Sequence, residues 1–219
     1  MINSLSDLYK FVKKYYEGYI DKFTLDENEL PKNIPDVLRD YYCEIGALTK
    51  IMPSEGNHSL TPLCSQDALA SPEELEYSDG FVEFACENQG NWICRVQCDS
   101  NDPEVFSNAA ELFGEGEGFQ SVNYPLSKFL ITLTLQEIVM SAPFLISLNV
   151  EDPREGLNGD VQPLWNNGKT AYNENSHDFF IVENTDLLLM NYYGDAWLAS
   201  KSESLEKYIK EDCYWRFIY

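Results

Sequence analysis

The two histidines of the chain, His58 and His177, are the first residues to consider for acid–base chemistry. Each lies in a polar stretch, beside Asn57 and Asp178 respectively. A Ser-His-Asp or Cys-His set could still assemble from positions far apart in the sequence. The sequence, however, contains neither a nucleophile elbow nor an H-E-x-x-H motif. We therefore interpret both histidines as solvated loop residues and predict no catalytic residues.

The six cysteines have no spacing typical of a metal site, because none forms a C-x-x-C pair. Cys86, Cys94 and Cys98 fall at apolar positions of predicted strands, where a reduced thiol packs as a small hydrophobic group. On one strand, Cys94 and Cys98 would hold their thiols roughly 13 Å apart, which is too far for a single metal ion. We predict reduced structural cysteines, no metal and no cofactor; a disulfide or metal role is the alternative.

Carboxylates are too frequent in this chain for a neighbouring pair of them to identify a site. Asp99, Asn101 and Asp102 are spaced like the start of a calcium loop, but the glycine and terminal glutamate of an EF-hand are missing. Residues 114–118 alternate glycine with glutamate. The glutamates would repel phosphate and no lysine follows them, so we predict an acidic flexible loop.

Negative charge is concentrated in the middle of the chain. The net charge is −22, and residues 51–127 hold fourteen acids against one base, Arg95, a local net of −13. Residues 1–50 have a net of −2 and residues 128–219 a net of −7. Solubility alone could account for this acidity, but it also predicts a surface complementary to a basic partner. Nucleic-acid binding is disfavoured, because phosphate contacts need Lys and Arg.

The acidic region contains a predicted antiparallel hairpin. Residues 81–87 and 92–98 place apolar side chains at every second position, which is typical of half-buried strands. Between them, Gly90 suits the positive φ of a tight turn. In the first strand this alternation assigns Val82, Phe84 and Cys86 to the buried face and Glu83 and Glu87 to the opposite face.

This hairpin and its flanking segments resemble one known family. The matching stretches are Phe84-Ala85, Gln89-Gly90-Asn91-Trp92 and Asp102-Pro103-Glu104-Val105-Phe106, with Leu30-Pro31 upstream and Pro125 to Leu130 downstream. Together they resemble the SUKH superfamily of bacterial toxin-immunity proteins and related fungal cell-wall-assembly regulators. The resemblance covers about residues 20–142. It departs at Glu44-Ile45-Gly46-Ala47, where family members often carry Asn-Gly-Gly.

The resemblance implies a non-enzymatic binding function. A SUKH-like immunity protein would bind and neutralise a cognate bacterial toxin of a polymorphic toxin system. We expect this toxin to be a basic nuclease domain. The alternative is a regulatory or scaffold module with no toxin partner. The acidic centre of the chain is an independent reason to expect a basic partner, because complementary charge speeds the encounter of two proteins. Our candidate partner-binding residues are Glu83, Glu87, Asn88, Gln89, Trp92, Asp99, Asp102, Glu104, Glu115 and Glu117.

Helices are predicted on both sides of the hairpin. Residues 5–19 repeat apolar side chains at steps of three and four. A second helix begins near Pro35, with Gly46 as its C′ glycine. Residues 128–140 would also fit a strand, because threonines alternate with apolar residues, but the length of the run and the stop at Pro143 favour a helix.

The C-terminal part of the chain is predicted to be rich in β-structure. A loop is expected from residue 145 to 175, with Trp165 packing back on the main body, and a last helix is expected after Ser202. Strand-like runs are Phe179 to Val182, Leu187 to Tyr192, Ala196 to Ala199 and Tyr214 to Tyr219.

These elements predict an α+β fold with a central, mainly antiparallel sheet, helices packed on it, and a C-terminal β-rich extension. We expect one domain over residues 1–219, in which a SUKH-like core of about 20–142 carries the extension of about 143–219. No apolar run reaches transmembrane length and none forms an N-terminal leader, so we expect a cytoplasmic protein without membrane contact. We favour a monomer.

Overall fold

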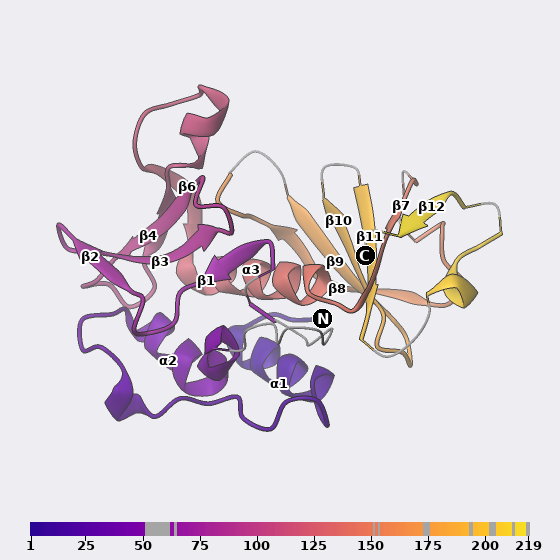
Figure 1. The fold of residues 1–219 in the computed structure, drawn as a ribbon, viewed down its shortest axis with the longest axis horizontal. Coiled ribbons are helices and arrows are strands. Elements are labelled where there is room, and N and C mark those ends of the chain that lie inside the picture. The colour runs from indigo at the N-terminus through magenta and orange to yellow at the C-terminus, as the bar shows by residue number, and fades with distance from the viewer. Residues whose placement is uncertain are drawn as a thin grey trace.

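The computed structural model describes residues 1–50, 62–63, 65–150, 152, 154–172, 176–192, 195–201, 205–211 and 213–217. It has three α-helices and two antiparallel sheets, which confirms the predicted α+β class. Figure 1 shows the first sheet and the second sheet side by side, with α3 running between them and α1 and α2 packed below. The helices are α1 (Leu5–Tyr15), α2 (Asp36–Ile45) and α3 (Leu126–Met140), with 3₁₀ turns η1 (Glu27–Glu29), η2 (Gly46–Lys50), η3 (Ala109–Phe113) and η4 (Glu206–Tyr208).

The first sheet is built around the predicted hairpin. Its hydrogen-bonded order is β1-β3-β4-β5-β6, and β2 pairs with β3 as well. Gly90 has φ of 74°, as the tight turn requires. The strands are β1 (Asp67–Leu69), β2 (Glu76–Ser78), β3 (Phe81–Glu87), β4 (Ile93–Gln97), β5 (Glu104–Ser107) and β6 (Gln120–Pro125).

The second sheet is formed by the C-terminal part of the chain, in the order β12-β7-β11-β10-β9-β8. The predicted strand-like runs are confirmed as β9, β10, β11 and β12. The predicted loop over residues 145–175 is wrong, because it contains most of β7 and all of β8. The strands are β7 (Phe144–Leu148), β8 (Val161–Gly168), β9 (His177–Val182), β10 (Leu188–Tyr192), β11 (Asp195–Ser200) and β12 (Trp215–Phe217).

Helix α3 lies in a hydrophobic core to which both sheets contribute, while a second cluster around Ile146, Leu189 and Leu198 belongs to the C-terminal half. Twelve of its fifteen residues are buried, so it has no polar face of the usual amphipathic kind. It contacts α1, α2, both sheets and the strand β8, where Trp165 donates from Nε1 to Thr132 Oγ1 at 3.0 Å. The predictions of a helix here and of Trp165 packing on the main body are therefore confirmed.

Gly46 does not end α2 in the predicted manner. Its φ of −62° is right-handed helical, and the chain continues directly into η2. A Cβ at this position would lie 2.9 Å from Tyr42 Cδ1 and 3.0 Å from Leu25 Cδ1. Glycine is required here by close packing and not by a left-handed cap.

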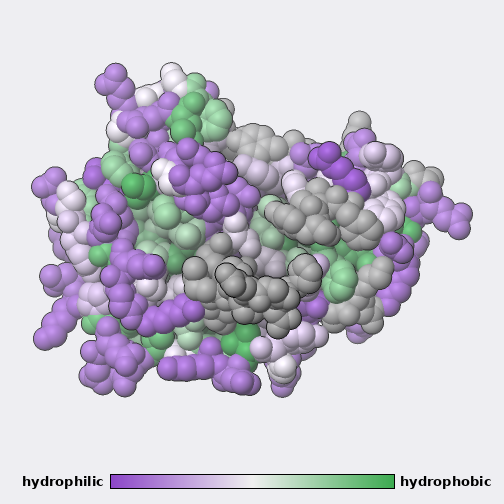
Figure 2. All heavy atoms as spheres, in the orientation of Figure 1, coloured by the Kyte–Doolittle hydropathy of each residue, from purple (hydrophilic) through white to green (hydrophobic). Residues whose placement is uncertain are grey.

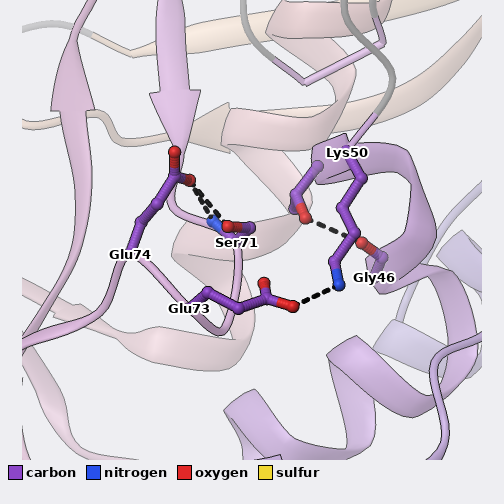
Figure 3. Close-up of polar contacts among 6 residues, drawn as sticks. Gly46, Lys50, Ser71, Glu73 and Glu74 are labelled. Carbon is purple, nitrogen blue, oxygen red and sulfur yellow. Dashed lines mark hydrogen bonds and ion pairs between the residues drawn. The ribbon is translucent and has the colours of Figure 1, made fainter. Parts of the chain in front are cut away.

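A capped turn ties η2 to the segment between β1 and β2. Glu74 accepts hydrogen bonds from the backbone N and the hydroxyl of Ser71, at 2.9 and 2.7 Å (Figure 3). The neighbouring Glu73 pairs with Lys50 at 2.5 Å in the same view. This confirms the predicted turn at Ser71.

At the other end of the chain, the predicted last helix is only the 3₁₀ turn η4, and its predicted cap Ser202 lies outside the described residues.

Candidate functional site

The predicted partner-binding residues do not form a single surface. Asp99, Asp102 and Glu104 lie at the end of the first sheet where β4 finishes and β5 begins, and Glu83 lies on the outer face of β3. The other six gather at the opposite end, where the β3–β4 turn (residues 88–92) lies beside η3. We call this end, residues 87–92 and 111–117, the tip surface; its predicted members are Glu87, Asn88, Gln89, Trp92, Glu115 and Glu117.

A β-bulge separates the two hairpin glutamates that were predicted to share a face. The register shifts between Glu83 and Ala85, so Glu83 lies opposite Arg95 whereas Ala85 lies opposite the buried Cys94. The extra residue reverses the alternation after it. Glu87 therefore lies on the inner face, opposite Asp67 of β1. By the same shift, Cys86 turns to the outer face beside Glu83, which corrects its predicted position.

Asp102 and Glu87 also accept hydrogen bonds that fix the backbone around them. Asp102 accepts from the backbone N and the hydroxyl of Ser127, at 2.8 and 2.7 Å, and so caps the N-terminus of α3 from a neighbouring loop. The carboxylate of Glu87 accepts from the backbone N of Gln89 and of Asn91, at 2.8 and 3.2 Å, and fixes the β3–β4 turn. Substituting either residue would change local structure as well as charge.

The tip surface opens into a cavity of about 350 Å³ between the two sheets and the end of α3. Its mouth is formed by exposed residues, and its floor by buried ones. No lysine, arginine or histidine occurs among the described residues that line it. The mouth consists of Gln66, Asn91, Leu112 and Phe113, and the floor includes Asp67, Ala109, Gln136, Ala171 and Met190.

Aromatic side chains from both halves of the chain form the walls. Trp92 comes from the hairpin, Phe113 from η3, and Tyr192 and Trp197 from β10 and β11. Tyr172 packs on Phe113 with ring centroids 4.5 Å apart, and its hydroxyl donates to Glu115 at 2.5 Å. The Nε1 of Trp197 is buried and has no hydrogen-bond partner among the residues that the structure describes. Such a mixture of apolar walls and few polar groups is typical of a ligand pocket.

Two buried carboxylates lie at the floor of this cavity and behind it. Glu137 is fully buried and accepts from the backbone N of Ser65, Gln66 and Asp67, at 2.6, 3.0 and 2.9 Å. Asp67 is 5% exposed and lines the cavity. Its Oδ2 accepts from Gln136 Nε2 at 2.5 Å, and its Oδ1 has no hydrogen-bond partner among the described residues. Glu137 thus anchors the start of β1, while Asp67 is presented to the cavity.

Both carboxyl groups titrate at unusually high pH. Burial, and next the charge of Asp67, raise the pKa of Glu137 to about 8, although the three backbone N–H donors oppose this shift. Burial also raises the pKa of Asp67 to about 7; the amide of Gln136 opposes this shift, and the charge of Glu87 adds to it. At pH 7 the pair therefore carries at least one proton.

The structure corrects the interpretation of His177. It lies in β9, fully buried, and stacks on Tyr192 with ring centroids 4.1 Å apart. Burial lowers the pKa of His177 to about 4, so its ring is neutral at physiological pH. His58 lies outside the described residues. Cys43, Cys86, Cys94 and Cys98 are free thiols, and Cys64 lies outside the described residues.

Two further findings concern metals and membranes. In the part of the chain that the structure covers, no three His, Cys, Asp or Glu residues are grouped to hold a metal ion. None of its helices there combines the length and the apolar character needed to cross a bilayer.

Sequence reasoning missed the residues that make the cavity chemically distinctive, namely Asp67, Gln136 and Glu137. One signal for them was present, because Gln136 and Glu137 are adjacent polar residues in a largely apolar helix. A polar pair at such a position must find partners inside the core. Nothing in the sequence indicated that those partners would come from the segment 65–67.

The chain was also compared with known proteins. It matches no protein-family model, no curated protein and no solved structure.

Proposed function

We propose that this chain is a non-enzymatic immunity protein of a polymorphic toxin system, which acts in the cytoplasm as a monomer. It binds a cognate basic toxin, a nuclease domain, through the tip surface. The observation that carries this proposal is the tip surface itself, where acidic residues surround exposed apolar side chains and the mouth of a cavity. The resemblance of residues 20–142 to SUKH proteins supplies the class of partner.

The apolar residues of the tip surface are suited to anchor a partner. Leu112 and Phe113 are 51% and 59% exposed, unusually so for large hydrophobic side chains. Figure 2 shows green, apolar atoms on the segment that projects at the top of the view, which Figure 1 identifies as the chain between β5 and β6. Protein interfaces typically combine such an apolar centre with a polar rim. The rim here is acidic, formed by Glu87, Glu111, Glu115 and Glu117.

None of the ion pairs among the described residues involves an acid of this rim. Arg95 is the one basic residue of segment 51–127. Its guanidinium lies on the outer face of the sheet, 4.4 Å from the ring centroid of Phe81 and 3.8 Å from that of Phe119. A basic partner would therefore meet a net negative charge at the tip surface. Occupying the phosphate-binding surface of a nuclease needs no chemistry from the inhibitor.

Neutralising the rim is expected to slow association with the toxin about tenfold or more at low salt. The tip variant combines Glu87→Gln, Glu111→Gln, Glu115→Gln and Glu117→Gln, since the amide oxygens can still accept the hydrogen bonds seen at three of these sites. Each exposed charge alone should contribute only about 0.2–1 kcal/mol. Stopped-flow association rates would be measured at low and high salt, because the Debye length is only about 8 Å at physiological ionic strength.

A matched control removes the same number of charges elsewhere on the first sheet. It combines Glu76→Gln, Glu83→Gln, Asp99→Asn and Glu104→Gln, and leaves the capping residue Asp102 intact. The control should retain most of the parent rate and its salt dependence. If the two variants slow association equally, only total charge matters and the tip surface is not the interface. If neither slows it, the acidity serves solubility.

A further inference from the structure

We propose that the cavity at the tip surface binds an organic cation, namely the guanidinium or ammonium group of a basic side chain that the protein partner inserts. The inference rests on the proposed function for the identity of the partner. It deepens that proposal, because it names one pocket and the chemical group that fills it.

The first argument is a buried carboxyl group at the floor that has no basic partner among the described residues. Asp67 is 5% exposed, and its Oδ1 has no partner within the described chain. The ion pairs of that part of the chain are Lys13–Glu44, Lys50–Glu73 and Arg154–Asp152, and none includes an acid of the cavity. A buried carboxylate is costly unless it is protonated or paired with a cation. Asp67 lines a cavity in which such a cation fits.

The second argument is the aromatic wall. Cations are attracted to the faces of aromatic rings, and several rings around a pocket with carboxylates form a typical receptor for an organic cation. Trp92, Tyr172, Tyr192 and Trp197 line this cavity together with the acids Asp67 and Glu87. The volume of about 350 Å³ is ample for the end of an arginine or lysine side chain.

Other ligand classes fit less well. An anion would be repelled by Asp67 and Glu87, and an apolar group would leave the Asp67 oxygen without a partner. A metal ion would need three or more closely placed ligand residues, and the described residues provide no such group. The cavity therefore favours a cation with a flat or apolar body.

Cation binding should be linked to proton release. The titratable groups around Asp67 are Glu87 on β3, Glu137 on α3, and the thiols of Cys86 and Cys94. Because burial raises the pKa of Asp67 to about 7, a fraction of the molecules carries a proton on Asp67 near pH 7, and a cation that pairs with the ionised carboxylate displaces that proton. Affinity should therefore rise between pH 6 and pH 8.

The test uses the full chain and three small probes. N-acetyl-arginine methylamide and N-acetyl-lysine methylamide carry the cation, and the citrulline counterpart has nearly the same shape as the arginine probe without charge. Binding would be followed by the fluorescence of Trp92 and Trp197 and by calorimetry. We expect millimolar dissociation constants for the cationic probes. The citrulline probe should bind at least tenfold more weakly, and the arginine affinity should rise severalfold from pH 6 to pH 8.

Variants decide whether the cavity is responsible. Asp67→Asn should weaken the binding of the arginine probe at least tenfold and abolish the pH dependence of its affinity. Glu87→Gln, at a half-exposed position, provides a second test should Asp67→Asn fold poorly. Glu183→Gln removes the same charge at an exposed position outside the cavity and should leave the affinity for the arginine probe unchanged. Equal binding of arginine and citrulline probes, or an unchanged affinity in both cavity variants, would overturn the inference.

These outcomes are separable from the fate of the proposed function. If the toxin binds but the probes do not, the partner uses the rim of the tip surface and not the cavity. If the probes bind but no basic toxin does, the cavity is a cation site and the immunity function is wrong. Both results are obtained from the same purified chain.

Discussion

Glu137→Leu is expected to lower the free energy of unfolding by about 3–5 kcal/mol, the largest effect of any single change considered for this chain. Glu137 is fully buried and satisfies the backbone N–H groups of Ser65, Gln66 and Asp67. Leucine leaves all three donors without an acceptor, and each such donor costs about 1–3 kcal/mol. Removing the repulsion with Asp67 acts in the opposite direction, but it offsets only part of this loss.

Urea denaturation of the parent, Glu137→Leu and Glu137→Gln would measure this effect. Glutamine keeps one side-chain oxygen as an acceptor. Glu137→Gln should therefore lower the free energy of unfolding by only about 1–2 kcal/mol, much less than Glu137→Leu. All three proteins should show the same m-value if they unfold from equally compact native states. A leucine variant as stable as the glutamine variant would show that Glu137 does not hold the start of β1.

The second large effect is expected in the pH dependence of stability. The pKa values of Glu137 and Asp67 rise from 4.5 and 3.8 to about 8 and about 7 in the folded chain. Between these limits the native state binds more protons than the unfolded state, so stability falls as pH rises. The contribution is fully present below about pH 4 and is lost by about pH 8. Each extra proton on the native state accounts for about 1.4 kcal/mol per pH unit. Asp67 retains its proton to about pH 7 and Glu137 to about pH 8, so we expect a loss of about 4–6 kcal/mol between pH 5 and pH 8.

Self-repulsion in a chain of net charge −22 also lowers stability as pH rises, and controls must separate the two causes. Asp67→Asn and Glu137→Gln each remove one titrating group of the pair and should flatten the curve between pH 5 and pH 8. Glu183→Gln removes an exposed charge and should leave the slope as in the parent. If Glu183→Gln flattens the curve as much as the cavity variants do, general repulsion is the cause.

The parts of the fold that the sequence predicted are those set by local pattern. Alternating apolar residues identified β3 and β4, and the run from residue 128 to 140 identified α3 by its length and its stop at Pro143. Strand β8 was missed for a physical reason. It lies at the edge of its sheet and contains Pro163 and three polar or glycine residues at its end, so it lacks the regular alternation of a central strand.

The candidate site was predicted less completely, because it depends on contacts between distant segments. One extra residue in β3 moved Glu87 to the inner face, and a bulge leaves no clear mark in the apolar pattern. The walls of the cavity come from the hairpin, η3 and the second sheet, which are up to about 100 residues apart in the chain. Charge counting found the acidic rim, but it could not show which acids are exposed and which are buried.

The proposed function predicts a basic toxin domain encoded beside this gene. The most direct test of the central claim is to mix the purified chain with such a domain and to measure complex formation and nuclease activity. We expect a one-to-one complex on size-exclusion chromatography and loss of nuclease activity at equimolar ratio. Phe113→Ala should weaken the complex by about 2 kcal/mol or roughly thirtyfold, as expected for a central apolar anchor. Full nuclease activity in the presence of excess chain, with no complex detected at low salt, would contradict the proposed function.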